Sequence, residues 1–325
     1  MVTSTPCANY SASTRRARPK RTDVPVLRIA TRTSALALAQ THLAADAIRA
    51  AHPGISVELV EVTTRGDRDQ ATPLHAMGGE GVFVAAVRDA VRDGSAEVAM
   101  HSLKDMPSEA VSGLVIGAML ERADPRDAFV GRDGRRLRDL PPGARVGTSA
   151  TRRAAILRAM RPDLDIVEIR GNVDTRLAKV ERGEYDGAIL AAAGLLRLGR
   201  LNEATEIYEA QAFLPSPGQG VIALECRAND TATRALLEAV DHGPTRVAAT
   251  AERAVLAALG AGCELGVAAY AQRDDGLLTI RAMLASTDRD GMPVFGDATG
   301  RPSEGEVLGF GLGKRLKVAL EGSGA

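Results

Sequence analysis

Short apolar runs alternate along the chain with stretches in which apolar residues recur every three or four positions, a pattern typical of an α/β protein. Apolar runs at 27–30 and 55–62 predict strands, and ALALAQTHLAADAIRAA between them predicts a helix over 34–51. Beyond these, a helix is predicted at 82–92 and strands at 97–100 and 114–120. The first part of the chain is therefore expected to form an α/β lobe.

The pattern restarts after 121–125, which we interpret as a crossing into a second lobe. Strands are predicted at 144–147, 165–169 and 188–192, and helices at 152–160, at 174–181 and from 195. Two strand-to-helix turns are alike, IATRTSALALAQ in the first lobe and VGTSATRRAAIL in the second. Both place hydroxyls and arginines where the free N–H groups of a helix amino terminus can bind an anion.

The last part of the chain has a different character. LPSPGQG at 214–220 is too rich in Pro and Gly for regular structure and predicts a hinge. The strand at 221–226 is expected to return to the first lobe, and a helix at 246–259 with a strand at 277–284 indicates a smaller α+β domain. The predicted divisions are an extension at 1–25, lobe 1 at 26–121 plus 221–240, lobe 2 at 126–214, and an α+β domain at 243–325.

Composition narrows the class of protein. At 325 residues the chain is long enough for two or three domains, and with 3 % aromatic residues its cores must consist of aliphatic side chains. Lys plus Arg and Asp plus Glu both number 41, which argues against a general nucleic-acid or membrane surface. No apolar run approaches the roughly 20 residues that span a bilayer. Residues 1–22 resemble a transit segment in composition, although an unstructured tail or an overextended start explains them equally well and is favoured.

The segment HSLKDMP, His101 to Pro107, stands where ligand sites are expected. It follows the apolar run at 97–100, and the carboxyl ends of strands in open α/β sheets carry the ligand sites. Lys104 and Asp105 are therefore predicted at such a site, where a cation and a carboxylate can bind a charged substrate. A turn-capping Asp beside a solvated Lys is the ordinary alternative for an isolated pair.

Arginine dominates the basic residues: five of the 41 are Lys, which leaves 36 Arg. A genome-wide coding bias is one explanation, and bidentate binding of carboxylates or phosphates by guanidinium groups is the other. Arg32, Arg152, Arg153 and Arg170 all follow predicted strand ends, which favours the second explanation. We expect an anionic ligand with several carboxylates between the lobes.

The three cysteines, Cys7, Cys226 and Cys263, show no metal-ligand spacing and cannot all pair, which favours a reducing cytosol. Cys226 lies in a predicted strand and is expected to be a buried apolar residue. Cys263 lies in LGAGCELG, where glycines leave its sulfur accessible. No His base is tied to it in the sequence, so a permanently attached group suits it better than a turnover nucleophile.

These motifs together resemble a known family. RIATRTSALAL, TRGD, HSLKDMP, ERADPRDAFV, VGTSATRR, RGNVDTRL, LPSPGQG, ECR and the Cys263 loop occur in the order seen in porphobilinogen deaminase, also called hydroxymethylbilane synthase. The resemblance runs from about Leu27 to about Arg315. It implies two periplasmic-binding-protein-like lobes with a central cleft and a third α+β domain. It also implies a transferase that condenses four porphobilinogen molecules, with release of ammonia, on a covalent dipyrromethane cofactor to give hydroxymethylbilane for tetrapyrrole synthesis.

The resemblance also implies roles for particular residues. Cys263 resembles the cofactor attachment site, through a thioether, and Asp105 resembles the catalytic carboxylate, which also contacts the cofactor. The residues that resemble those holding the cofactor's carboxylates are Lys104, Ser149, Arg152 and Arg153. The residues that resemble those binding the incoming ring are Arg32, Ser34, Arg170 and Arg176. The chain departs from the family pattern at Ala76 and Glu80, where lysine is usual, and at Ala150, where serine is usual.

Two alternative classes of protein make different predictions for the sequence. A non-enzymatic solute-binding protein of the same shape would carry a secretory signal and no domain with an exposed thiol. A ligand-sensing regulator would need a helix-turn-helix or partner domain, which the sequence does not show. We expect a cytoplasmic monomer that acts on a small molecule, binds no metal, and has neither nucleic acid nor membrane as a partner.

Overall fold

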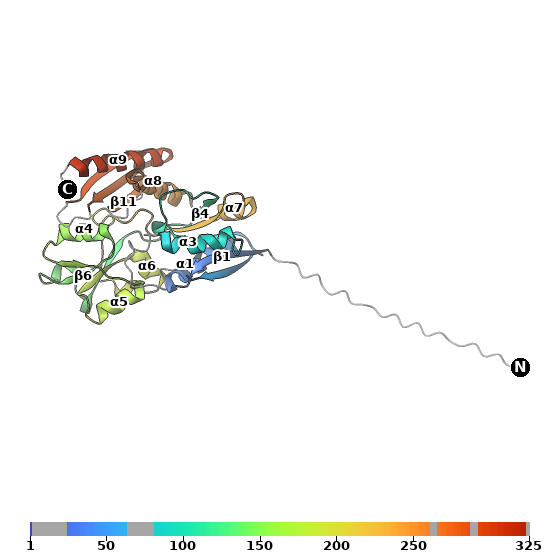
Figure 1. The fold of residues 1–325 in the computed structure, drawn as a ribbon, viewed down its shortest axis with the longest axis horizontal. Helices are drawn as coiled ribbons and strands as arrows, with labels where there is room; N and C mark the ends of the chain where they lie inside the picture. Colours follow the sequence, from blue (N-terminus) through green and yellow to red (C-terminus); the bar gives the residue numbers. More distant parts are fainter. Residues whose placement is uncertain (2–24, 64–80, 261–264, 287–291, 323–325) are drawn as a thin grey trace.

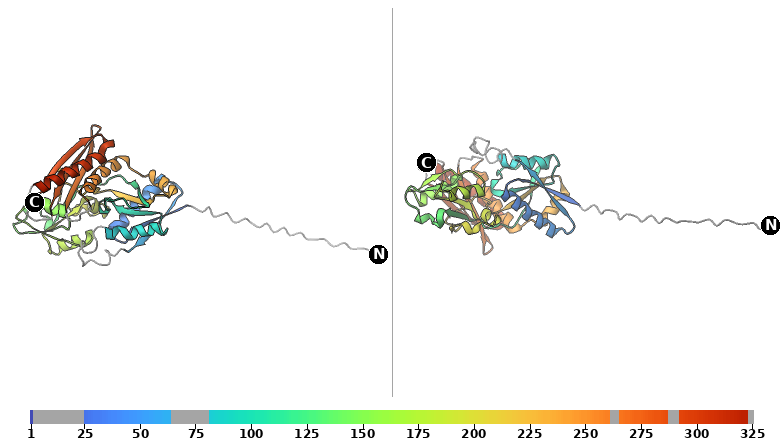
Figure 2. Two further views of the ribbon diagram at one scale, coloured as in Figure 1. Left: turned by 45° about the horizontal axis from the view of Figure 1, so that its top comes forward. Right: turned by 90° about the horizontal axis from the view of Figure 1, so that it is seen from below.

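The computed structural model describes residues 1, 25–63, 81–260, 265–286 and 292–322. Figures 1 and 2 show three bodies in contact. Lobe 1 contains β1 and α1, lobe 2 contains β6 and α5, and a third domain with β11 and α9 lies against both (Figure 1). The expected fold class, two α/β lobes with a smaller α+β domain, is confirmed.

Lobe 1 is built on a five-stranded sheet of order β2-β1-β3-β10-β4. β1 pairs in parallel with β2 and β3, whereas β10 is antiparallel to both β3 and β4. The predicted return of the chain to lobe 1 after the hinge is therefore confirmed. The strands are β1 (Val26–Arg32), β2 (Ser56–Val62), β3 (Val98–Ser102), β4 (Leu114–Met119) and β10 (Ile222–Arg227). The helices are α1 (Ala35–Ala51), α3 (Gly81–Arg92) and α7 (Thr231–Glu238).

Lobe 2 repeats this plan with the order β7-β6-β8-β5-β9. Its strands are β5 (Asp127–Gly131), β6 (Arg145–Gly147), β7 (Asp165–Val167), β8 (Gly187–Ala191) and β9 (Glu206–Ile207). Its helices are α4 (Thr151–Met160), α5 (Val173–Glu181) and α6 (Ala192–Arg197). The expectation of a helix from 195 was wrong about its start, because β8 runs into α6 without turn residues, with Ala191 at the N-cap. β5, which the apolar pattern did not reveal, is antiparallel to β8.

The third domain is an antiparallel sheet under two helices. It consists of β11 (Gly266–Asp274), β12 (Leu277–Ala285), β13 (Val294–Gly300), α8 (Gly243–Leu259) and α9 (Gly305–Gly322). Glycines allow the two helices to approach closely, since a Cβ at Gly309 would lie 2.1 Å from the Ala251 carbonyl oxygen. Short 3-10 turns occur at Leu103–Asp105, Arg132–Gly134, Leu137–Asp139, Leu201–Glu203 and Pro302–Glu304.

Two chain segments cross between the lobes, and they are bonded to one another. The Ala123 amide donates to the Gly220 carbonyl (3.2 Å), and Arg122 Nε donates to the Gln219 carbonyl (2.8 Å). Gly220 has a φ of 88°, and a Cβ there would lie 2.6 Å from the Ala123 oxygen. Only glycine suits this position, which explains the Gly-rich segment in the predicted hinge.

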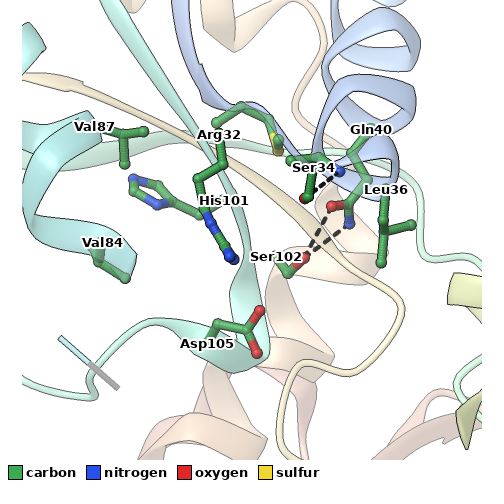
Figure 3. A pocket seen from close by; sticks show the side chains of 11 residues that line it. Arg32, Ser34, Leu36, Gln40, Val84, Val87, His101, Ser102 and Asp105 are labelled. Atoms are coloured by element: carbon green, nitrogen blue, oxygen red, sulfur yellow. Dashed lines mark hydrogen bonds between the residues drawn. The ribbon is translucent and has the colours of Figure 1, made fainter. Parts of the chain in front are cut away.

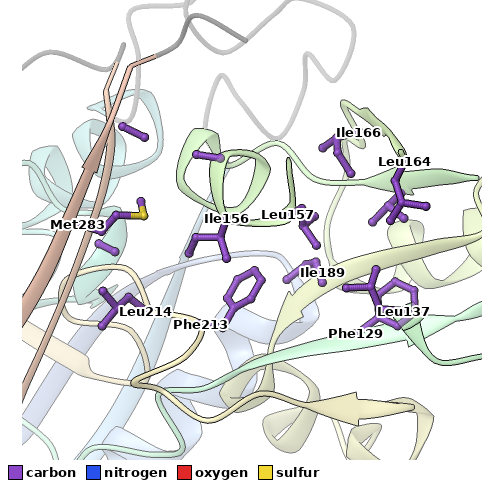
Figure 4. Close-up of a cluster of buried hydrophobic side chains, with 14 of the residues drawn as sticks. Phe129, Leu137, Ile156, Leu157, Leu164, Ile166, Ile189, Phe213, Leu214 and Met283 are labelled. Carbon is purple, nitrogen blue, oxygen red and sulfur yellow. The ribbon is translucent and has the colours of Figure 1, made fainter. Parts of the chain in front are cut away.

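The third domain packs against each lobe through a separate core. Ile156 of α4 and Met283 of β12 belong to one buried cluster, which joins the domain to lobe 2 (Figure 4). Ala249 of α8 packs in another cluster with Leu103 and Met106 of lobe 1. Within the described ranges, no helix has both the length and the apolar character required to cross a membrane.

Candidate active site

The segment HSLKDMP forms a tight turn at the end of β3. Leu103 to Asp105 make one 3-10 turn, after which Met106 returns to an extended conformation. Leu103 is fully buried and Met106 is 2 % exposed, while Lys104 and Asp105 between them are only partly buried. The two apolar side chains therefore anchor the turn, and the two charged ones remain available. The predicted position just past the end of a strand is confirmed.

A pocket opens beside this turn (Figure 3). The carboxyl end of β1 supplies Arg32, the start of α1 supplies Ser34, and the turn supplies Asp105. Ser34 also caps α1, because its Oγ accepts from the Ala37 amide (3.4 Å). Gln40, which the sequence reasoning missed, lines the same pocket and bonds to Ser102 through Nε2 (2.9 Å).

A buried ion network lies behind the pocket wall. Glu225 of β10 accepts two hydrogen bonds from Arg88, at 2.8 and 2.9 Å, and its Oε2 lies 3.2 Å from His101 Nε2. Burial opposes ionisation of Glu225, but the bonds from His101 and Arg88 outweigh it and lower the pKa of this carboxyl to about 2. The network fixes the His101 ring, which lines the pocket together with Asp105.

In lobe 2, the arginines that follow the first strand-to-helix turn are buried and paired with a carboxylate. Arg152 and Arg153, at the start of α4, are 4 % and 5 % exposed, and both bond to Asp127, which is fully buried. Arg152 Nη1 donates to Asp127 Oδ2, and Arg153 Nη2 donates to Oδ1, each at 2.7 Å. Burial would raise the pKa of Asp127, but the charges and hydrogen bonds of the two arginines hold it well below its usual range. Both guanidinium groups thus have a resident carboxylate, and their predicted contact with cofactor carboxylates stays a prediction.

Of the other predicted residues of lobe 2, Ser149 and Arg170 follow strands and Arg176 lies on α5. Ser149 Oγ donates a hydrogen bond to the Ile169 carbonyl. Arg170 is partly buried, with Nε 3.8 Å from Glu168 Oε1. Arg176, on α5, is also partly buried, and its Nε donates to the Gly171 carbonyl (2.7 Å).

Electrostatic effects connect the two lobes. Burial lowers the pKa of the Lys104 ammonium to about 8, although the neighbouring Asp105 opposes the shift. The Arg153 guanidinium of lobe 2 lowers this pKa too. Burial likewise lowers the pKa of Arg176 to about 10, with Arg153 adding to the shift and Asp105 opposing it. The Asp105 turn of lobe 1 therefore lies within electrostatic reach of Arg153 and Arg176 of lobe 2.

Cys263 lies outside the described residues, and so do Ala76 and Glu80. The residues that follow the Cys263 segment are described, and they contact lobe 2. A Cβ on Gly266, at the start of β11, would lie 3.1 Å from the backbone nitrogen of Arg152. The chain that leaves the cysteine segment thus packs against the amino terminus of α4. Ala150, at the N-cap of α4, provides no side-chain cap, unlike Ser34 in lobe 1.

Three polar residues near the crossing were not singled out from the sequence. Asp127 follows ERADPR in a motif that was noted, but nothing marked it as a partner of two arginines. Gln219, in the hinge, is fully buried and donates to Asp127 Oδ1 (2.9 Å). Arg197 donates to the Gly220 carbonyl (2.7 Å), and burial lowers its pKa to about 10. In each case, the only sign of a buried polar role in the sequence was a polar residue next to an apolar run.

Comparisons with known proteins extend this description. The family model described as "Porphobilinogen deaminase, dipyromethane cofactor binding domain" matches residues 27–235, and "Porphobilinogen deaminase, C-terminal domain" matches 247–318. The porphobilinogen deaminase of Roseiflexus sp. (strain RS-1) is 47 % identical over 89 % of this chain and 94 % of its own length. That of Leifsonia xyli subsp. xyli (strain CTCB07) is 48 % identical over 92 % of this chain and 93 % of its own. Among solved structures, the methionine-binding protein MetQ is 10 % identical, with a TM-score of 0.44 over 68 % of this chain and 92 % of its own.

The fold and the site define a two-lobed α/β protein with a third domain, in which both lobes bring cationic side chains within electrostatic reach of one turn-borne carboxylate. The matches cover both lobes and the third domain. The chain belongs to the porphobilinogen deaminase family.

Proposed function

We propose that the chain is a hydroxymethylbilane synthase, a transferase that joins four porphobilinogen molecules head to tail and releases ammonia at each addition. In this proposal the growing chain is attached to a dipyrromethane cofactor held on Cys263 by a thioether. The observation that carries the proposal is the turn-borne carboxylate of Asp105, which lines a pocket with Arg32 and lies within electrostatic reach of Lys104 and of Arg176 of lobe 2. Family membership supports the same reaction. A cytoplasmic location and a monomeric state are part of the proposal.

The side chains present fit a cofactor that bears several carboxylates. Burial, together with repulsion from Arg153, lowers the pKa values of Lys104 and Arg176, so their charged forms lack sufficient compensation. A ligand with several carboxylates would supply it. The start of α4 has no side-chain cap at Ala150. The backbone N–H groups of a helix amino terminus carry partial positive charge, so they too favour an anion. When bound, the cofactor would supply the pyrrole end to which the first substrate is joined.

We assign the residues of this chain to two groups. Lys104, Ser149, Arg152 and Arg153 would hold the cofactor's acetate and propionate groups beside Cys263. Arg32, Ser34, Arg170 and Arg176 would bind the carboxylates of the incoming ring. Contact of Gly266 with the Arg152 backbone supports the first group, because it brings the end of the cysteine segment to these residues. The pocket shared by Arg32, Ser34 and Asp105 supports the second (Figure 3).

Asp105 would stabilise the positive charge that develops on porphobilinogen as ammonia leaves. A preorganised carboxylate in a partly desolvated site is worth more than in water, and it costs no reorganisation during the reaction. The same carboxylate can accept a hydrogen bond from a pyrrole N–H. Lys104 cannot take this part, since it has no acceptor atom in its charged form.

The test is turnover of porphobilinogen by the purified chain, with ammonia release and bilane formation measured together. We expect four ammonia molecules per bilane, and no turnover by Cys263→Ala. Cys226→Ala is the matched control, because Cys226 is fully buried in β10 and burial raises the pKa of its thiol to about 11. Saturable porphobilinogen binding without ammonia release would instead indicate the solute-binding protein that we considered as an alternative.

A further inference from the structure

The carboxylate of Asp105 has to be held in place by its own main chain. Within the described residues, no side chain donates a hydrogen bond to it, and it projects from a single 3-10 turn. The carbonyl groups that border this turn cannot all be satisfied locally. Met106 lies outside the 3-10 turn, and Pro107 has no N–H group, so no ladder continues through it. The Leu103 carbonyl accepts the Met106 amide within the turn (3.1 Å). Whatever binds the Met106 and Pro107 carbonyls therefore acts together with the buried side chains of Leu103 and Met106 to set the position of the carboxylate.

A guanidinium group from the third domain binds them. Arg253 Nη1 donates to the carbonyls of Leu103 (3.4 Å) and Met106 (3.0 Å), and Nη2 donates to that of Pro107 (2.6 Å). One planar group therefore contacts the main chain on both sides of Asp105. Guanidinium geometry suits this task, because its donors lie in one rigid fork.

The helix that carries Arg253 is itself fixed at the neighbouring residue. Glu252 is fully buried, and its carboxylate accepts from Arg122 Nη1 (2.6 Å), from the Gly218 amide (2.7 Å) and from the Ala271 amide (2.8 Å). These partners belong to the two crossing segments and to β11. Glu252 thus fixes the rotation of α8 relative to both lobes. Because Arg253 is the next residue of the helix, its position is fixed as well.

We infer that Arg253 is a positioning residue that keeps the Asp105 turn in register with the third domain. The inference rests on the proposed function, in which Asp105 is the catalytic carboxylate. The α8 helix ends at Leu259, shortly before the segment that contains Cys263. The same helix therefore carries the guanidinium group that binds the main chain beside Asp105, and it precedes in the chain the segment that would bear the cofactor in the proposed function.

The helix also offers a matched control. Arg246 of α8 donates through Nη2 to the carbonyls of Ile116 (3.3 Å) and Gly117 (3.1 Å) in lobe 1, and through Nε to Asp241 (2.7 Å). It makes the same kind of contact between the same two bodies, but with β4 instead of the Asp105 turn. A general loss of packing between the third domain and lobe 1 should therefore appear in both variants.

The experiment compares Arg253→Met, Arg253→Lys and Arg246→Met in cofactor-loaded protein, with loading measured by intact mass. We expect Arg253→Met to lower kcat by about 10–100-fold with KM within threefold, since a displacement of about 1 Å can cost on the order of a hundredfold. Arg253→Lys, which can reach some of the carbonyls, should fall between Arg253→Met and the parent. Arg246→Met should lower Tm while leaving kcat within twofold.

A double-mutant cycle separates positioning from a merely structural role. Asp105→Glu already displaces the carboxylate, so adding Arg253→Met should cost no more than about threefold further in kcat. Equal kcat in Arg253→Met and Arg246→Met, or fully additive losses in the cycle, would overturn the inference while leaving the proposed function intact. Full activity of Asp105→Asn would instead refute the role of Asp105, and that result does not depend on Arg253.

Discussion

The two lobes share one sheet order but use the start of their first helix in opposite ways. In lobe 1, Ser34 caps α1, and Arg32 and Ser34 line an open pocket. In lobe 2 the cap is Ala150, and the following arginines turn inward to a buried carboxylate. In the proposed function this difference corresponds to a division of labour between these two turns. The turn of lobe 1 presents groups that an arriving substrate would reach, and the turn of lobe 2 keeps a rigid set of charges suited to a permanent cofactor.

Removing the buried carboxylate of lobe 2 should have the largest effect. Asp127→Asn leaves two buried guanidinium groups without a counter-charge, and breaking such a pair typically costs about 3–5 kcal/mol. Asp124→Asn is the control, since Asp124 bonds to Arg126 at 2.8 Å but keeps 22 % of its side chain exposed. Its loss should cost about 0–1 kcal/mol. Urea unfolding of both variants measures the difference, and equal losses would contradict the division of labour.

The contribution of Asp127 to the stability of the fold depends on pH in a defined direction. The folded-state pKa of Asp127 lies below its unfolded value, so its stabilisation is present above the unfolded pKa of about 3.9. It is lost as the pH falls through the lower folded-state pKa. Replacing Arg152 or Arg153 with Leu leaves Asp127 with one arginine partner beside Gln219 and should give mainly cofactor-free protein of lowered Tm. Full cofactor loading in both variants would argue that these arginines have no part in holding the cofactor.

In the proposed function, the Asp105 carboxylate of lobe 1 should govern the rate of turnover and contribute little to stability. Asp105→Asn keeps the shape and removes the charge, and loss of one preorganised electrostatic group typically costs on the order of 10²–10³ in turnover. Asp105→Glu keeps the charge one methylene away and should retain part of the activity. Ammonia release by cofactor-loaded variants measures this. Turnover of Asp105→Asn within tenfold of the parent would mean that the carboxylate is structural.

Lys104, whose pKa is influenced by charges of both lobes, should make cofactor uptake pH-dependent. With a pKa of about 8, its charged fraction falls from roughly nine-tenths at pH 7 to one-tenth at pH 9. Uptake of the anionic cofactor by cofactor-free protein should therefore slow about tenfold over this range. Lys104→Arg keeps its charge and should remove the slope. An identical slope in both proteins would assign the titration to another group.

The smallest effect is expected at Glu80, where the family usually has lysine. Glu80→Lys should change KM by no more than a few-fold, because exposed ion pairs are worth about 0–1 kcal/mol. Because the loop around Ala76 and Glu80 lacks the usual lysines, we predict that it is a lid that is dispensable for binding carboxylates. The loop lies outside the described residues, so steady-state kinetics must decide. A hundredfold improvement in KM would show that the loop binds substrate directly.

The parts of the site that the sequence predicted are those with a local pattern. Ser34 precedes a long amphipathic helix, and Asp105 follows an apolar run and precedes Pro107, so both positions follow from periodicity and turn chemistry. The partners that complete the site are distant in sequence. Asp127 meets Arg152 across lobe 2, and Arg253 meets the Asp105 turn from another domain. No spacing along the chain identifies such pairs, because the sheet order that creates them is set by non-local packing.

The central claim, a covalent dipyrromethane on Cys263, is tested most directly by intact mass after denaturation. Parent, Cys226→Ala and Cys263→Ala chains would be purified from a host that makes porphobilinogen. The account predicts the same excess mass, that of a dipyrromethane, on the parent and on Cys226→Ala, and none on Cys263→Ala. A parent chain without any adduct, or an adduct that persists in Cys263→Ala, would contradict it.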